Sequence, residues 1–439
     1  MMNKLLFYFL GCGVFTAFGQ DYKPHRCLTP EYISHLDAQH SGTAASIQSA
    51  YEDNVSRIRS ANYQKSDDEY IIPVVFHVVY NNAGQNLHDS IIMNQLLILN
   101  EDYNRLNGDS ANLRNQFLPY KGKVGVRFVL ASYDPDGNPT TGIVRRQTNL
   151  STFFTAAALQ GDFSSLERVK SDANGGSSPW NTNKYLNIWV CNMAMTYMNM
   201  SIPAILGYAK PPLNMSNWPA GSVPNITDGV VLQYQTVGRN NPHSPMTIMG
   251  TTVEFFGRTA THEVGHYLGL RHIWGDGDCN VDDGLSDTPN MIESSDQDCD
   301  VTKNTCVDNI DGVDLPDLIE NFMDYSAEDC QNMFTAQQAN LMRSVMENQR
   351  YDLTHNNVNS VQKVDAIQAQ LYPNPAQSEI TIQTSQVLNG TLTIVDVTGR
   401  TVKVISTHGD VTKVAVNDMV PGVYSVSFEG KQIARFVKQ

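Results

Sequence analysis

Apolar and polar positions predict strands that alternate with helices from about residue 70 to residue 350. The stretch 70–80 is a continuous run of β-branched and aromatic residues, which is typical of a buried strand. Apolar residues near helical spacing predict a helix over 89–105. Further strands are predicted over 124–131, 186–191 and 228–234, a short helical segment over 163–172, and a terminal helix over 335–348. This alternation favours an α/β sheet.

From residue 370 onward the pattern changes to short β-prone runs, several of them separated by glycine-containing turns. These runs are 379–383, 391–397, 401–405, 411–416, 423–428 and 432–436. Short strands at this spacing predict a small all-β sandwich over 370–439. The polar composition of 356–369 predicts a linker, and the larger domain before it is placed at 68–355.

The first residues are typical of an export signal. Lys4 precedes an apolar run from Leu5 to Phe18, so 1–19 are predicted to be a signal peptide. The alternative is a lipoprotein signal, because 10–12 read Leu-Gly-Cys, a weak lipobox. No other stretch is long and apolar enough to span a membrane. We therefore expect an exported protein without a membrane span in its mature form.

Residues 20–67 have the composition of a propeptide. They are polar, with a helical patch over 44–59, and Arg57, Arg59 and Lys65 offer cleavage points before the first strong strand. A segment of this kind predicts a protein that is made as a zymogen and activated by cleavage.

The negative net charge of the chain limits which classes of partner it can bind. The chain has 439 residues, which is enough for two or three domains, and a formal net charge of −15 with an isoelectric point near 5.1. An excess of carboxylates argues against nucleic acid as a partner and favours a soluble protein that uses calcium.

The stretch 261–272 carries the chemistry. His262 and His266 are four residues apart, so on a helix both imidazoles lie on one face and can share a metal ion. Glu263 lies beside that position, where a carboxylate can take a proton from a water molecule. Gly269 allows a sharp turn out of the helix, expected to run over 258–268, and His272 then arrives as a third ligand. Three nitrogen ligands with one open position describe a catalytic zinc site.

A bare pair of histidines at this spacing also occurs by chance in helices, but the added Gly269 and His272 make chance a poor explanation. Downstream, residues 321–326 read Asn-Phe-Met-Asp-Tyr-Ser. A methionine in apolar surroundings is usually part of the core. Its position after the zinc motif instead favours Met323 as a methionine turn beneath the metal.

Seven cysteines are present, and Cys12 would leave with the signal peptide. The last four predict two disulfides across a loop-like segment, with three possible connectivities: Cys279, Cys299, Cys306 and Cys330. Cys27, in the predicted propeptide, has two possible roles. Its thiolate could occupy the open zinc position as a latency switch, or it could form a disulfide with Cys191.

The segment after His272 is rich in aspartate and glycine. Carboxylates clustered in this way can bind a hard cation, although a solvated loop has the same composition. We predict a structural calcium ion there, with these candidate ligands: Asp282, Asp283, Asp287 and Thr288.

The region from about 70 to 349 resembles the pappalysin family of metzincin proteases. The resemblance is carried by the zinc motif, by Gly-Tyr-Ala at 207–209, by Asp-Thr-Pro at 287–289, by the spaced cysteines and by 321–325. It implies an α/β (α+β) domain with a mixed sheet and a zinc-binding active-site helix. It also implies zinc ligands at His262, His266 and His272, Glu263 as general base, and Tyr325 as the group that stabilises the tetrahedral intermediate.

The same resemblance implies finer features. Related bacterial enzymes prefer a basic residue directly after the scissile bond (P1′), and the matching pocket acid would be Asp329. They bind structural calcium near the loop after the zinc motif. They pair the four cysteines first to third and second to fourth, which here gives Cys279–Cys306 and Cys299–Cys330. Cys27 lies in a context like that of cysteine switches, but Leu28 stands where glycine is frequent.

The C-terminal module resembles the sorting domain of the type IX secretion system. The resemblance rests on Tyr-Pro-Asn-Pro at 372–375, Gly-Val-Tyr at 422–424 and a basic end. It implies that the type IX machinery is a partner and that the protein is secreted or held at the cell surface. The rival is a carbohydrate- or protein-binding sandwich, but no line of aromatic residues supports sugar stacking.

Together these features predict a secreted zinc endopeptidase that acts on proteins or peptides and is made as a zymogen. The alternative is a non-catalytic surface-binding protein that contains zinc. Glu263 favours the enzyme, because folding requires no base at that position.

Overall fold

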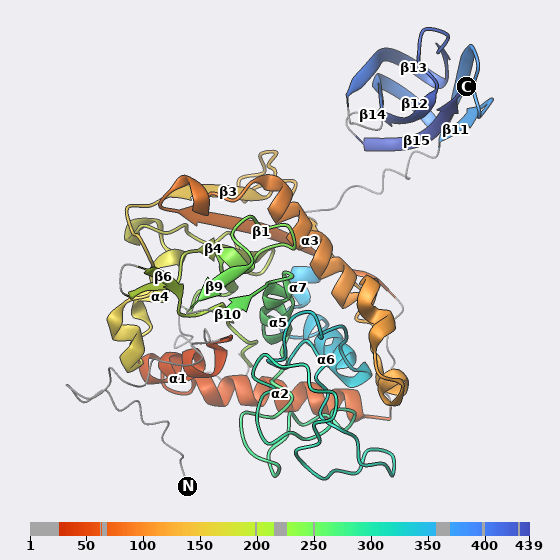
Figure 1. Ribbon diagram of the computed structural model, residues 1–439. Coiled ribbons are helices and arrows are strands. Elements are labelled where there is room, and N and C mark those ends of the chain that lie inside the picture. The colour runs from red at the N-terminus through yellow and green to blue at the C-terminus, as the bar shows by residue number, and fades with distance from the viewer. Residues whose placement is uncertain are drawn as a thin grey trace. The chain divides into compact units, whose positions relative to one another are not determined.

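The computed structural model describes residues 26–61, 63, 68–197, 200–214, 226–248, 251–356, 369–396, 400–428 and 431–439. The chain divides between residues 359 and 360 into two compact units (Figure 1). The predicted signal peptide, the alternative lipobox and the linker, apart from its two end residues, lie outside the described residues.

The first unit is built on a mixed six-stranded sheet in the order β2-β1-β4-β8-β7, in which β3 also pairs with β1. All its pairings are parallel except that of β7 with β8. The strands are β1 (Tyr70–Tyr80), β2 (Val126–Leu130), β3 (Ile143–Gln147), β4 (Leu186–Cys191), β7 (Gly207–Ala209) and β8 (Val230–Gln233). The centre of the sheet is covered on both faces, which explains why β1 and β4 are mostly apolar; their polar residues, His77 and Asn187, are buried as well. The predicted α/β domain with a mixed sheet is confirmed.

Four helices of the first unit pack on this sheet or on one another. They are α3 (Asp89–Tyr103), α5 (Arg258–Tyr267), α6 (Ala336–Met346) and α7 (Tyr351–Thr354). Helix α5 contacts α3 and the strands β7 and β8. Thr335 begins α6 with a capping box to Gln338, as expected for a helix start. The central position of α5 places the zinc motif inside the main core.

Two helices precede the first strand: α1 (Thr29–Gln39) and α2 (Thr43–Arg59). Figure 1 shows α2 lying alongside α6 and the loops that follow α5. Asn54 connects α2 to this region, because its side chain bonds to Gln349 and accepts a hydrogen bond from Ser344. The predicted helical patch over 44–59 is therefore one continuous helix packed on α6 and the residues near it.

Short elements complete the unit. The hairpins are β5 (Ala194–Tyr197) with β6 (Met200–Pro203) and β9 (Met246–Ile248) with β10 (Thr251–Val253). The short helices are η2 (Ala83–Gln85), η3 (Gly108–Asn112), η4 (Asn115–Tyr120), η5 (Ala156–Gln160), α4 (Ser164–Glu167), η6 (Arg168–Lys170), η7 (Asp172–Asn174) and η9 (Tyr234–Thr236). The predicted helical segment 163–172 is thus broken into α4 and 3₁₀ turns.

The second unit is a small all-β domain, as predicted. Its antiparallel sheet has the order β11-β12-β14-β15, and β13 pairs with β12. The strands are β11 (Ala369–Tyr372), β12 (Glu379–Val395), β13 (Thr401–Ala415), β14 (Gly422–Phe428) and β15 (Lys431–Lys438). Predicted runs 379–383 and 391–397 join in the long β12, and 401–405 and 411–416 join in β13. Among the described residues, no helix is both long and apolar enough to cross a membrane.

Candidate metal centre

Three imidazoles meet at one point beside the sheet. His262 and His266 lie one turn apart on α5, and His272 comes from the loop after it. Their Nε2 atoms are 3.1 to 3.2 Å apart in all three pairs. Nitrogen ligands of a tetrahedral zinc ion, with bonds near 2.0–2.1 Å, lie ~3.3 Å apart. The spacing of the three rings therefore fits a zinc ion.

The chain reaches this geometry by leaving the helix at Gly269, as the sequence predicts. Gly269 has φ +95°, and a Cβ there would lie 2.9 Å from a methyl group of Val345. Both the backbone conformation and the close packing therefore favour glycine. The turn brings His272 back toward the helix.

The Nδ1–H group of each ring donates a hydrogen bond to a fixed oxygen acceptor. His262 Nδ1 bonds to the carbonyl of Phe322 at 2.8 Å, and His266 Nδ1 to the carbonyl of Leu270 at 2.8 Å. His272 Nδ1 lies 2.6 Å from Asp276 Oδ1. A proton on Nδ1 leaves a lone pair on Nε2, which is the form that binds metal. Burial and the neighbouring imidazoles also lower the pKa of His262 well below its usual value and that of His266 to about 3.

Glu263 is fully buried next to the three rings. Its Oε1 atom has no hydrogen-bond partner, whereas Oε2 accepts from Thr29 Oγ1 at 3.2 Å and from Cys27 Sγ at 3.4 Å. Burial raises the pKa of Glu263 to about 8. Strand β7 passes so close that a Cβ on Gly207 would lie 2.7 Å from Glu263 Cγ. Glycine at 207 therefore allows the base to lie directly under the edge strand.

The methionine turn lies beneath the helix. Met323 is fully buried, and a Cβ on Gly265 of α5 would lie 2.5 Å from its sulfur atom. The ring of Tyr325 is 5.6 Å from that of His262 and 4.9 Å from that of His272, centre to centre. Its hydroxyl donates to the carbonyl oxygen of Cys27 at 3.2 Å. The turn therefore supports the helix and brings a hydroxyl to the metal centre.

Cys27 faces the histidines. Its Sγ atom and one nitrogen of each of His262, His266 and His272 all lie within 4.8 Å of one another. Both Cys27 and Cys191 are buried and unpaired, so the alternative disulfide between them is not formed. The next residues pair with the free edge of β7: Leu28 N donates to Gly207 O, and Ala209 N donates to Thr29 Oγ1, both at 3.0 Å. The role of Thr29 was not predicted, because nothing in its sequence context distinguishes it.

Comparison with known proteins agrees with this geometry. The family model described as pregnancy-associated plasma protein-A matches residues 244–347, and that of a secretion system C-terminal sorting domain matches 370–439. An extracellular metalloprotease of Verticillium alfalfae is 30% identical over 289 residues, which cover 65% of this chain and 80% of the relative. One from Colletotrichum graminicola is 28% identical and covers 64% and 77%.

Solved structures show the same relationship. Mature mirolysin of Tannerella forsythia, in complex with a cleaved peptide, is 36% identical and matches 67% of this chain and 99% of its own, with a TM-score of 0.54. A promirolysin mutant is 33% identical and matches 76% and 98%, with a TM-score of 0.59.

The chain belongs to the pappalysin family of metalloproteases. The predicted family, the metalloendopeptidase activity and the sorting domain are thereby confirmed, and the protein is secreted or located at the cell surface. The family implies a catalytic zinc ion, and the converging Nε2 atoms of this pappalysin fit that ion.

One acid that the sequence does not single out lies at the start of α5, the zinc helix of this pappalysin. Glu328 is buried, and its carboxylate accepts hydrogen bonds from the backbone of Phe256, Arg258 and Thr259 at the start of α5. Gly257, the residue before α5, has no side chain to cap the helix, so Glu328 does so from the methionine-turn region. Arg26, next to Cys27, lies 3.7 Å from Glu328 Oε1 and donates to the carbonyl oxygens of Tyr325 and Ser326.

Asp329, the predicted pocket acid, is placed differently. Its side chain is exposed, and its Oδ1 atom lies 3.7 Å from Cys299 Sγ and 3.5 Å from Cys330 Sγ. The structure therefore places Glu328, and not its neighbour Asp329, beside Arg26. Arg26 belongs to the N-terminal segment, residues 26–61, whose Cys27 faces the histidines. Neighbouring acids in a loop have no periodicity from which the sequence could indicate which one points inward.

The disulfides are paired as the resemblance implies, Cys279 with Cys306 and Cys299 with Cys330. The four candidate calcium ligands lie in the loop closed by the Cys279–Cys306 disulfide, and they differ in their hydrogen-bond partners. Asp287 accepts from Thr335 Oγ1 and Gln337 N and so caps α6. The Thr288 hydroxyl donates to Asp283 Oδ1.

Asp282 and Asp283 differ in burial. Asp282 is exposed and accepts from Gly284 N. Asp283 is buried, and its Oδ2 atom has no hydrogen-bond partner. Burial raises the pKa of Asp283 to about 8. Of the four candidates, Asp283 is therefore the one whose ionised carboxylate a bound cation would stabilise most.

Proposed function

We propose that this pappalysin is a zinc endopeptidase that cleaves before basic residues and that residues 20–67 keep it latent. The observation that carries the proposal is the convergence of three Nε2 atoms beside the unpartnered Oε1 of Glu263. His262, His266 and His272 would hold the zinc ion. When bound, zinc would polarise the substrate carbonyl and lower the pKa of a water molecule.

The side chains around that ion have separate tasks. Glu263 takes a proton from the attacking water as the new C–O bond forms, and it passes this proton to the amine nitrogen as the C–N bond breaks. Tyr325 donates its hydroxyl to the developing oxyanion. In the structure this hydroxyl already donates to a peptide carbonyl, that of Cys27, which supports the assignment.

The substrate lies along the free edge of β7. Gly207 O and Ala209 N face away from β8, and the N-terminal segment occupies both through Leu28 and Thr29. A substrate main chain takes the same two partners once this segment has left, since pairing with a strand edge is a general way to bind a peptide.

Latency depends on the same contacts. Cys27 would fill the fourth zinc position as a thiolate when the metal is bound. Thr29 already donates to Glu263, and the carbonyl oxygen of Cys27 already accepts the hydrogen bond of the Tyr325 hydroxyl. We expect Cys27→Ala to shorten the lag before activity appears in the purified proenzyme. A variant proenzyme as inert as the wild type would contradict the switch.

The proposed preference for basic residues is supported by Arg26. Its guanidinium occupies a position bounded by Glu328 and by the carbonyls of Tyr325 and Ser326, and a substrate Lys or Arg could take that position. Asp329 stays a second candidate for the pocket acid. We also propose a structural calcium ion at Asp283, and export through the type IX machinery by the C-terminal domain.

Cut-site mapping tests the function. The processed protein is incubated with a denatured protein substrate, and the new termini are sequenced, with Glu263→Gln as the matched variant and zinc content measured in both. We expect cuts before Lys and Arg by the wild type and a loss of about 10²- to 10⁴-fold in rate for Glu263→Gln at equal zinc content. Equal cleavage by the two proteins would overturn the mechanism and favour the alternative, a non-catalytic zinc-containing surface-binding protein.

A further inference from the structure

The third histidine is oriented differently from the other two. His262 and His266 belong to a buried helix, and both donate to main-chain carbonyls. His272 belongs to a loop, and its Nδ1 lies 2.6 Å from a side chain, the carboxylate of Asp276. Its direction therefore depends on residues that a helix does not position.

The loop is folded so that this carboxylate returns to the ring. Gly275 N donates to His272 O at 3.0 Å and closes a turn. Gly275 has φ +60°, and a Cβ there would lie 2.5 Å from the carbonyl oxygen of Asp282. Asp276 follows with φ +56°, a conformation that Asp tolerates better than most residues. Two successive residues with positive φ thus bring Asp276 back over His272.

A second group holds the plane of the ring. Trp274 stacks on His272 with ring centres 4.2 Å apart and an angle of 6° between the planes. Trp274 in turn contacts the ring of Tyr325, with centres 4.7 Å apart. Stacking limits the tilt of the imidazole, and the hydrogen bond to Asp276 limits its rotation, so together they define where Nε2 points.

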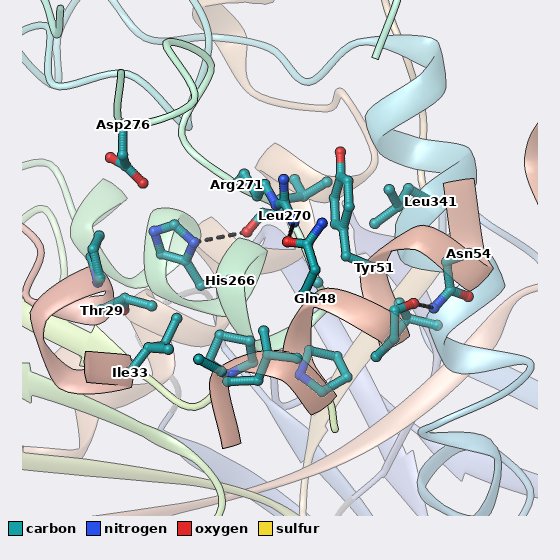
Figure 2. A pocket seen from close by; sticks show the side chains of 18 of the residues that line it. Thr29, Ile33, Gln48, Tyr51, Asn54, His266, Leu270, Arg271, Asp276 and Leu341 are labelled. Carbon is teal, nitrogen blue, oxygen red and sulfur yellow. Dashed lines mark hydrogen bonds between the residues drawn. The ribbon is translucent and has the colours of Figure 1, made fainter. Parts of the chain in front are cut away.

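We propose that Asp276 is a positioning residue for the third metal ligand. It accepts the Nδ1 proton of His272, holds Nε2 toward the point shared with His262 and His266, and makes this imidazole a stronger ligand than a carbonyl acceptor would. Figure 2 shows Asp276 and His266 among the residues that line one cavity of about 280 Å³. The inference rests on the proposed function, because it assumes that the three histidines hold zinc.

The alternative interpretation is that Asp276 is simply a solvated acid in an acidic loop, because its side chain is 43% exposed. Asp278 provides the matched control. It is exposed in the same loop, and its Oδ1 atom accepts from the backbone and side chain of Asn280. A general effect of loop charge or loop stability should appear equally in variants of the two aspartates.

Zinc release from the full-length protein tests the inference. The variants are Asp276→Gly, which removes the acceptor but tolerates positive φ, Asp276→Asn, which keeps an acceptor without charge, and Asp278→Asn. Transfer of zinc to a chromogenic chelator is followed with time, and the melting temperature of each zinc-free form is measured separately. We expect release about 10- to 100-fold faster for Asp276→Gly, a smaller increase for Asp276→Asn, and wild-type rates for Asp278→Asn.

Each result has a distinct meaning. Wild-type release from both Asp276 variants would overturn the positioning role while leaving the proposed function intact. An equal increase in all three variants, or an increase matched by a lower melting temperature of the zinc-free form, would also overturn it. Failure of the wild type to bind zinc would overturn the proposed function and this inference together.

Discussion

Helix α5 and the segment 270–330 that follows it supply the same metal centre, but they are held by different interactions. All ten residues of α5 are buried, and packing against β7, β8, α3 and Met323 fixes them. The segment 270–330 contains no α-helix or named strand within the part of the chain that the structure describes, and it has two disulfides and many aspartates that bond to nearby backbone N–H groups. One half of the site is thus fixed by packing, and the other by crosslinks and local polar contacts.

This difference shows how a metal ligand is positioned accurately in a segment without regular secondary structure. His262 and His266 need only the helix and one carbonyl each. His272 needs Gly269, Gly275, Trp274 and Asp276 to reach an equivalent position. The loop half should therefore be more sensitive to loss of crosslinks, and the helix half more sensitive to changes in volume.

Loss of a disulfide should have the largest effect on stability. The double variant Cys279→Ser, Cys306→Ser opens a crosslink between residues separated by 27 positions. Chain entropy then predicts a loss of about 3–4 kcal/mol in the free energy of unfolding. Denaturant unfolding of the variant and of the wild type measures it, and an unchanged midpoint would show that crosslinks do not stabilise this half.

A change of volume in the helix should come next. Gly265→Ala places a methyl group against the Met323 sulfur, and overpacking of this kind costs about 1–3 kcal/mol. Gly108→Ala is the matched control, because a Cβ there meets no atom within 4 Å. Thermal melting of the two variants compares them. Equal melting temperatures would mean that the packing of the methionine turn is loose.

The acid that connects the two halves gives a third test. Glu328→Gln leaves backbone N–H groups at the start of α5 poorly paired, at a cost of about 1–2 kcal/mol, and Asp329→Asn should cost almost nothing. The ratio of cleavage before Arg to cleavage before Leu is measured for both variants. We expect the ratio to fall for Glu328→Gln. A fall for Asp329→Asn alone would instead support the acid that the sequence resemblance indicates.

The smallest effect should come from calcium, and it should depend on pH. The pKa of Asp283 is raised to about 8 by burial, whereas an unfolded Asp ionises near pH 3.9. The stability that this protonated group contributes is therefore complete below about pH 4 and is lost as the pH rises through about 8. Calcium binds the ionised carboxylate, so it should restore stability mainly at high pH.

The effect of calcium can be bounded. A dissociation constant of about 0.1 mM, as in weak extracellular sites, gives about 1.4 kcal/mol at 1 mM calcium. The measurement is the rise in melting temperature on adding calcium, which we expect to be larger at pH 8.5 than at pH 5 and absent in Asp283→Asn. No calcium effect at either pH would contradict the proposed site.

The features that the sequence predicts correctly are those that local spacing decides. The spacing of His262, Glu263 and His266 predicts one helix face, and Gly269 predicts the exit that brings in His272. The apolar runs of β1 and β4 predict buried strands. These features depend on residues that are neighbours in the chain or on one element.

Contacts between distant segments could not be predicted from the sequence, because no local pattern indicates them. Thr29 binds Glu263 across 234 positions, and Glu328 caps α5 across about 70. Asp287, whose predicted role as a calcium ligand stays a prediction, also caps α6 across about 50 positions. Strand β3 was missed because it contains the exposed Arg145 and Arg146 and so lacks an apolar pattern.

The most direct test of the account is the set of atoms bound to zinc before and after processing. X-ray absorption spectroscopy of the zinc-loaded protein reports sulfur and nitrogen ligands separately, at about 2.3 and 2.0–2.1 Å. We predict three nitrogens and one sulfur in the full-length protein, from the three histidines and Cys27. After removal of the N-terminal segment, we predict three nitrogens and an oxygen. Absence of sulfur before processing would contradict the switch, and fewer than three histidine nitrogens in the processed protein would contradict the metal centre itself.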